Sequence, residues 1–176
     1  KRTDLSSYDF YKTQKLKPHN ILIIESKPDS ESWNKILENV ANGSDAMIIG
    51  GSLSEAIADS LSLATKTVTY EDSNVLFLTD TKLKNDSLNI DKFASGTGFY
   101  LIGKKGEILG SKEGEEEMAN FIKVNHGKGH LYLHLEPLIL TNYYLLKPGN
   151  EKYVQDVFSY LPDRETIWFS GDNKNV

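Results

Sequence analysis

Three histidines at steps of four residues, His126, His130 and His134, have the most suggestive spacing for chemistry in this sequence. Glu136 follows two positions after the last of them. Imidazole and carboxylate groups are common ligands of transition metals, so the segment invites a metal-site hypothesis. On a helix, a step of four would place the three rings on one face. The first question is therefore whether the segment is a helix or a strand.

The alternation of side chains predicts a half-buried strand. From residue 130 to residue 136, leucines alternate with histidine, tyrosine and glutamate. Four residues of strand span roughly 13 Å, so His130 and His134 cannot share one ion. His126 and His130 flank a glycine-containing hairpin turn, where they could face each other with β-carbons roughly 5 Å apart. We expect a polar strand face without a metal, and a two-histidine site at His126 and His130 is the alternative.

Gly50, Gly51 and Ser52 form a second candidate site between a buried strand and the start of a helix. Amide groups at such a place can hold an anion. Neither the dinucleotide glycine pattern nor the phosphate-loop lysine accompanies them, so a tight turn is the main interpretation.

Asp80 and Asn142 each follow an apolar run, where the side chains of ligand sites are often placed. Asp80 could bind a metal or stabilise a turn. Asn142 could hold backbone groups of a turn or contact a ligand.

The elements that must position these side chains alternate in type at the start of the chain. Residues 20–24 and 46–49 are apolar runs typical of strands buried in a parallel sheet. Helical stripes follow each run, and Ser52 with Glu55 forms a capping box at the start of the second helix. This order predicts a parallel α/β sheet.

The remaining segments predict a mixed architecture. Strands are expected at residues 67–70, 75–78, 99–102, 107–109, 121–124 and 166–169, with an irregular stretch from 79 to 95. Asn150 is expected to cap a helix that reaches residue 161. Residues 1–18 are interpreted as an N-terminal arm or linker, and residues 19–176 as one α/β domain.

Composition limits the function further. The 176 residues carry a formal net charge of −5, which disfavours binding to nucleic acid. The absence of cysteine removes disulfides, thiolate metal sites and thiol nucleophiles. No Gly-x-Ser-x-Gly motif provides a serine nucleophile.

Residues 120–146, with the helix from Asn150 to residue 161, resemble the C-terminal half of bacterial envelope proteins that carry the domain of unknown function 4350. The resemblance covers residues 120–170 and the strand–helix–strand region from 20 to 63. The matching features are a Gly-x-Gly turn, a proline after a strand, a Thr-Asn pair, an Asn before a helix and a Trp-containing last strand, here Gly127, Gly129, Pro137, Thr141, Asn142, Asn150 and Trp168.

The resemblance implies a Rossmann-like, class I glutamine amidotransferase-like α/β fold, with a partly parallel sheet and a C-terminal β-hairpin and helix. It also implies an extracytoplasmic (periplasmic) domain, anchored by transmembrane helices that are not present in this chain. The implied partners are MoxR-type ATPases and von Willebrand A-like proteins in an envelope complex. The amidotransferase reaction needs a cysteine nucleophile, which these residues lack.

We therefore expect a non-catalytic binding or scaffolding domain with protein partners and no cofactor. The alternative is a small-molecule or metal-binding site at the carboxyl ends of the strands, near Gly50, Gly51, Ser52 and Asp80.

Overall fold

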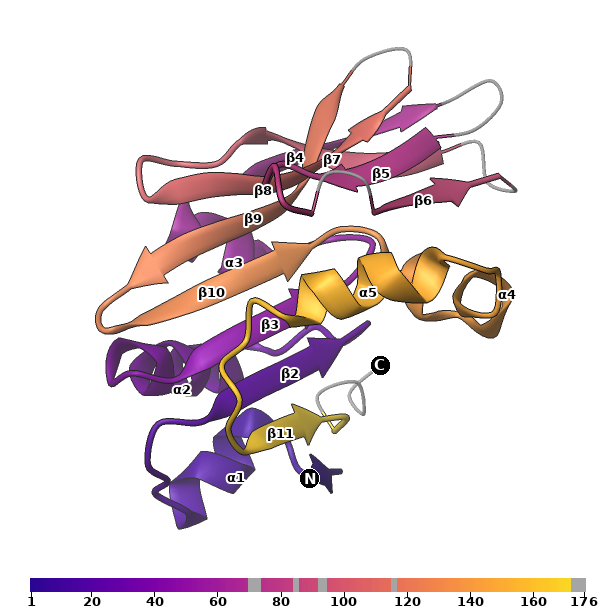
Figure 1. Cartoon of the computed structure of the whole chain (residues 1–176). Helices are drawn as coiled ribbons and strands as arrows, with labels where there is room; N and C mark the ends of the chain where they lie inside the picture. The colour runs from indigo at the N-terminus through magenta and orange to yellow at the C-terminus, as the bar shows by residue number, and fades with distance from the viewer. Residues whose placement is uncertain (70–73, 84–85, 92–94, 115–116, 172–176) are drawn as a thin grey trace.

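The computed structural model describes residues 1–176 except 70–73, 84–85, 92–94, 115–116 and 172–176. A single sheet runs through the molecule in the order β1-β11-β2-β3-β10-β9-β8-β5-β6, and β7 joins β4 to β9 (Figure 1). The described strands are β1 (Arg2–Thr3), β2 (Asn20–Ile24), β3 (Asp45–Ile49), β4 (Ala64–Thr69), β5 (Asn74–Leu78), β6 (Ser87–Ile90), β7 (Ser95–Leu101), β8 (Gly106–Glu113), β9 (Met118–His126), β10 (Gly129–His134) and β11 (Thr166–Phe169).

Strands β1, β11, β2, β3 and β10 are parallel, which confirms the prediction of a mixed α/β fold with a partly parallel sheet. The predicted hairpin is formed by β9 and β10, and a helix follows it in the chain. The described helices are α1 (Ser7–Thr13), α2 (Ser30–Ala41), α3 (Glu55–Leu61), the 3-10 helix η1 (Pro137–Leu140), α4 (Asn142–Leu145) and α5 (Asn150–Phe158).

Helices cover both faces of the parallel half. On one face α1, α2 and α3 bury Phe10, Trp33 and Ile57 against a layer that includes Leu131 and Leu133. On the other face α5 buries Tyr153 and Val157 with Met47 and Tyr132, and Figure 1 shows it crossing in front of the sheet. Because both faces of the sheet are covered, the sequences of the parallel strands are nearly continuous apolar runs.

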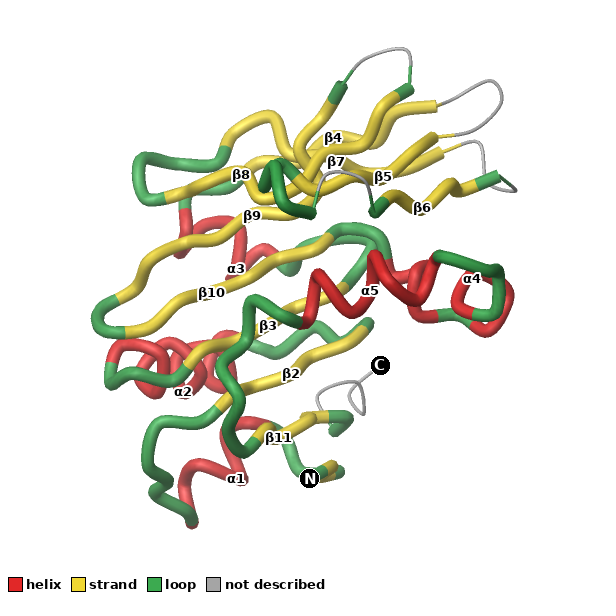
Figure 2. Tube along the Cα trace, viewed as in Figure 1, coloured by secondary structure: helices red, strands yellow, loops and turns green. Residues whose placement is uncertain are grey.

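The other half of the sheet is antiparallel. The described part of residues 64–126 consists of strands and turns, which Figure 2 shows in yellow and green above the helical half. The prediction of an irregular stretch from 79 to 95 is wrong, because it contains β6. Leu88 and Ile90 of β6 are fully buried, and the strand pairs with β5.

Two predicted helix starts are also wrong. Ser54, not Ser52, caps α3, since its side chain accepts the Ile57 N–H group. Asn150 is the first residue of α5 and Gly149, at φ 91°, precedes it as the cap. The Asn150 amide instead donates to the carbonyl oxygen of Tyr144 over 2.9 Å.

Residues 1–18 contribute two elements to the body of the molecule. Strand β1 pairs with β11, and α1 packs on α2. Phe10 lies against Phe169 with ring centroids 5.2 Å apart, and both side chains are buried.

Candidate functional site

His130 and His134 lie on strand β10, as predicted, and His126 ends β9, but their surroundings differ from the expectation. His134 and Glu136 are 1% and 6% exposed, so the expected polar, half-buried face is wrong. Strand β10 is central in the sheet, with β3 on one side and β9 on the other. The face that carries Tyr132 and His134 packs against Tyr160, Phe121 and Tyr153.

The hairpin register separates His126 from His130. His126 is paired with Gly129, and His130 with Asn125. Since paired residues share a face and neighbours alternate, the two imidazoles leave opposite faces of the sheet. The alternative of a two-histidine site, in which His126 and His130 face each other, is therefore wrong. Among the described residues, no three His, Asp or Glu side chains are arranged to hold a metal.

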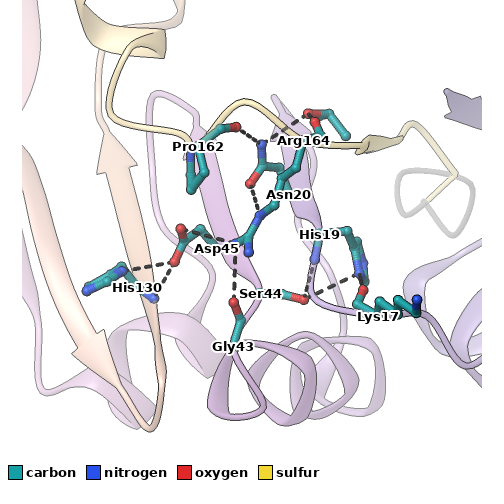
Figure 3. A network of polar contacts seen from close by, with 10 residues as sticks. Lys17, His19, Asn20, Gly43, Ser44, Asp45, His130, Pro162 and Arg164 are labelled. Carbon is teal, nitrogen blue, oxygen red and sulfur yellow. Dashed lines mark hydrogen bonds and ion pairs between the residues drawn. The ribbon is translucent and has the colours of Figure 1, made fainter.

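His130 instead belongs to a polar network at the amino edge of the parallel strands. The buried carboxylate of Asp45 accepts the His130 backbone N–H at 2.8 Å and contacts its Nδ1 at 3.0 Å. Arg164 lies 3.2 Å from the second Asp45 oxygen. Arg164 also donates to Asn20 Oδ1 and to the Gly43 carbonyl oxygen (Figure 3). The network connects β2, β3, β10 and the segment before β11.

Asp80 lies at this same amino edge of the sheet. It follows β5, which is antiparallel to β8 and therefore runs opposite to the parallel strands. Its carboxylate accepts the Lys82 N–H at 2.9 Å in an exposed turn. The topology therefore places Asp80 at the edge opposite Gly50, Gly51 and Ser52.

Asn142 is exposed at the first position of α4. Its backbone carbonyl accepts the Leu146 N–H at 3.2 Å. The buried amide that holds the backbone in this region is that of Asn150.

At the carboxyl edge, the amides of Gly50 and Gly51 already have acceptors within the protein. Gly50 N–H donates to the His134 carbonyl at 3.0 Å, and Gly51 N–H donates to Glu25 Oε1 at 2.8 Å. Ser52 is exposed in the turn that follows. A carboxylate of the chain itself thus stands where an external anion was hypothesised.

Glu25 follows β2 directly and has φ 50°. This left-handed conformation is uncommon for residues other than glycine and costs free energy, which the surrounding structure must offset. The next residue, Ser26, has a buried hydroxyl that forms no hydrogen bond with the described residues. Strained residues and unsatisfied polar groups concentrate at functional sites, so this turn marks the edge as a candidate.

His134 ends β10 within a buried hydrogen-bond chain. Its Nδ1 accepts the Glu136 N–H at 3.1 Å, and its Nε2 lies 2.9 Å from the Tyr153 hydroxyl. Because Nδ1 accepts, the proton of the neutral ring is on Nε2 and is donated to Tyr153. Burial, together with the charge of Lys112, lowers the pKa of His134 to about 3. The ring is therefore neutral at ordinary pH.

Asn120 approaches this chain from β9. Phe121 pairs with Gly110 and Ala119 with Ser111, so Asn120 sits at a register shift between β8 and β9. Such bulges redirect side chains. The Asn120 amide is fully buried beside the Tyr153 hydroxyl, but neither amide atom forms a complete hydrogen bond.

Two buried charged groups complete the cluster. Lys112 of β8 is 1% exposed and donates to the Thr97 carbonyl oxygen at 2.7 Å. Burial lowers the pKa of Lys112 to about 8, against the opposing effect of Glu136. Burial raises the pKa of Glu136, while the Leu138 N–H and Lys112 oppose the rise.

A pocket of about 220 Å³ opens beside these groups. Glu136 and its neighbours after β10 form one wall, and β4 and β7 contribute the other. Its lining residues are Gly51, Thr67, Gly96, Thr97, Leu135, Glu136, Pro137 and Leu138.

Sequence reasoning missed Glu25, Lys112, Asn120 and Tyr153. Glu25 carried a usable signal, because it follows an apolar strand just as Gly50 does, and the argument about carboxyl ends applies equally to both. Lys112, Asn120 and Tyr153 belong to no local motif, and only the topology brings them together.

The fold and this edge define a mixed α/β domain whose buried polar cluster lies at the carboxyl ends of its parallel strands. The family model for "Domain of unknown function (DUF4350)" matches residues 1–158, and the chain belongs to that family. The match includes the N-terminal residues and the middle of the chain as well as the region from 120 onward. No curated protein sequence matches the chain.

Several solved structures share the fold at low sequence identity. The "mmIFT52 N-terminal domain" is similar with a TM-score of 0.59 and 14% identity, over 90% of this chain and 81% of that one. "Cytoplasmic Protein STM1381 from Salmonella typhimurium LT2" gives a TM-score of 0.52 and 11% identity, over 88% and 80%. The β-galactosidase from Bacillus circulans sp. alkalophilus gives 0.52 and 9%, over 81% of this chain but only 22% of that enzyme.

Within the described part of the chain, none of the helices has the length and apolar character needed to cross a membrane.

Proposed function

We propose that this chain is a non-catalytic binding domain of a membrane-anchored envelope protein. In this proposal its parallel half is a Rossmann-like layer of the class I glutamine amidotransferase type that has no nucleophile. It binds protein partners on the extracytoplasmic side of the membrane, and the candidate partners are MoxR-type ATPases and von Willebrand A-like proteins.

The observation that carries the non-catalytic part is the state of the imidazole at the carboxyl edge. Both nitrogens of His134 have partners within the protein. A general base needs a free position within reach of substrate. His134 is buried with both nitrogens engaged, so it has no such position.

The absence of cysteine from the sequence supports the lack of an amidotransferase nucleophile. Exposed apolar side chains lie in two places where a partner could bind. Tyr100 and Leu101 on β7 are 65% and 52% exposed, and Leu146 after α4 is 81% exposed.

A direct binding measurement tests the partner assignment. The purified chain is titrated by calorimetry with the soluble domain of a von Willebrand A-like protein from the same organism, and separately with a MoxR-type ATPase. We expect micromolar binding to at least one of them. Tyr100→Ser/Leu101→Ser and Leu146→Ser are compared with the wild type to locate the contact. Absence of binding to both proteins contradicts the assignment.

A hydrolysis panel tests the non-catalytic part. The chain is incubated with ester, amide and phosphate substrates, and we expect no turnover above the rate in buffer. Turnover that is lost in His134→Gln or Glu136→Gln would show that the edge is an active site.

A further inference from the structure

The carboxylate of Glu136 has an unusual position, because it is buried and yet lines a pocket. Glu136 is 6% exposed, and it lines the pocket together with Gly51. Among the described residues, the Leu138 N–H at 3.2 Å is the only hydrogen-bond donor to this carboxylate. The second oxygen accepts no hydrogen bond from the described residues, so it can accept one from a donor in the pocket that Glu136 lines.

The charges around the pocket favour a cationic occupant. Glu25 and Glu136 are near enough to each other for Glu25 to raise the pKa of Glu136, and Lys112 is the cation that acts on both Glu136 and His134. The two carboxylates and the ammonium group together carry a net negative charge. The Gly51 amide, which could have bound an anion, is already occupied by Glu25.

The walls of the pocket suit a short alkyl chain. Leu135, Pro137 and Leu138 provide apolar surface on one side, and Thr67 and Thr97 come from the β4–β7 ribbon on the other. A volume of about 220 Å³ is at the small end for a ligand site, so the occupant must be small or must be a single side chain.

We propose that this pocket binds a primary alkylammonium group, with Glu136 as the charged acceptor and the threonine and leucine walls around the alkyl stem. The group could belong to a free small amine or to a lysine side chain of a partner protein. This inference adds a ligand chemistry that the proposed scaffolding function does not require.

The test is a titration followed by amide chemical shifts of the 15N-labelled chain. The probes are n-butylammonium chloride, for a free amine, and Nα-acetyl-lysine N-methylamide, for a protein side chain. We expect saturable shifts at Gly51, Gly96 and Leu138 with a dissociation constant on the order of 1 mM, since ligands of a few heavy atoms bind weakly. The probe that binds more tightly identifies the source of the group.

Matched variants give the test its specificity. Glu136→Gln keeps the shape of the side chain and is expected to weaken binding at least tenfold. Glu107→Gln removes an exposed carboxylate, the partner of Lys123, and is expected to bind like the wild type. Thr67→Leu fills the pocket from the exposed side of β4 and is expected to abolish binding without altering Glu136, which keeps the test valid if Glu136→Gln does not fold.

Three results would overturn the proposal. One is the absence of saturable shifts with either probe. Another is equal binding of n-butanol, which has the same alkyl chain and no charge. The third is unchanged affinity in both Glu136→Gln and Thr67→Leu.

Discussion

The two edges of the parallel sheet use polar residues in opposite ways. At the amino edge, the carboxylate of Asp45 receives Arg164 and two nitrogens of His130, so each charge has a partner of opposite sign or a hydrogen bond. At the carboxyl edge, the described residues give Glu136 a single donor and the Asn120 amide no complete hydrogen bond. The same strands therefore end in a satisfied network on one side and an incompletely satisfied cluster on the other.

The difference separates stability from function. Paired groups at the amino edge join β2, β3 and β10, and both oxygens of the Asp45 carboxylate have partners within the protein. Groups at the carboxyl edge are buried with incomplete hydrogen bonding, which costs free energy. Proteins retain such groups where the groups take part in binding. We expect substitutions at the first edge to destabilise the fold and substitutions at the second edge to be tolerated or stabilising.

Replacing Asp45 should have the largest effect on stability. Asp45→Ala leaves Arg164 and the His130 N–H without their acceptor, and we expect a loss of about 3 kcal/mol in the free energy of unfolding. Urea denaturation measures it. Asp59→Ala, on the exposed side of α3, is the control and should change stability by less than about 0.5 kcal/mol. A loss at Asp45 no larger than at Asp59 would remove the distinction between the edges.

The carboxyl edge should make stability depend on pH. The pKa of His134 falls to about 3 in the folded state from an ordinary 6.5, so the unfolded chain binds more protons between these values. Stability should therefore decrease as pH falls from 6.5, by about 2 kcal/mol at pH 5 from this residue alone. Denaturation of wild type and His134→Gln at pH 6.5 and pH 5 gives the change in the free energy of unfolding with pH for each protein, and the two changes are compared.

Glu136 should act with the opposite sign. Its raised pKa means that the folded state binds more protons, so the contribution of Glu136 weakens stability as pH rises above the ordinary range of a glutamate. Glu136→Gln should remove that decrease. Slopes that change in the same direction in the two variants would contradict the assigned environments.

Asn120 offers a smaller and stabilising change. Since its buried amide lacks complete hydrogen bonds, Asn120→Leu should raise the free energy of unfolding by about 1 kcal/mol. Asn150→Leu is the matched control, because that amide is bonded to the Tyr144 carbonyl and its loss should cost about 1 kcal/mol. Thermal unfolding of both variants gives the signs, and a destabilised Asn120→Leu would show that its amide is satisfied.

The smallest effect concerns Glu25 and Ser62, the two non-glycine residues with positive φ in the described part of the chain. Ser62 ends α3 at φ 54°, and Ser62→Gly should stabilise the protein by about 0.5 kcal/mol by relieving the left-handed conformation. Glu25→Gly relieves the same kind of strain but removes the acceptor of the Gly51 N–H, so we expect no net gain. A gain equal to that of Ser62→Gly would mean that the Glu25 contact contributes nothing.

Much of the fold follows from local sequence patterns. Apolar runs at 20–24 and 46–49 predict the parallel strands, and the alternation at 130–136 identifies β10 as a strand. The burial of both faces of β10 was not predictable in the same way, because Tyr132 and His134 carry polar groups and are covered only by Tyr160 and Tyr153, which come from later in the chain.

The site was less predictable than the fold. Gly50 and Gly51 were identified from their position after a strand, and they do lie at the carboxyl edge. Lys112 and Asn120 come from strands whose neighbours are fixed by long-range pairing and by a bulge, and neither feature is encoded in a short stretch of residues.

The position of β10 has a consequence for how the chain folds. It pairs with β3, although 85 positions separate His130 from Asp45, and the whole antiparallel half lies between them in the sequence. The centre of the sheet therefore cannot form until the segment between β3 and β10 brings β10 back to β3. The chain entropy lost on closing this long loop precedes the contacts that offset it. We expect slow folding through an intermediate in which the edge of β3 that later pairs with β10 is exposed. At that stage β3 is most prone to pair with another chain.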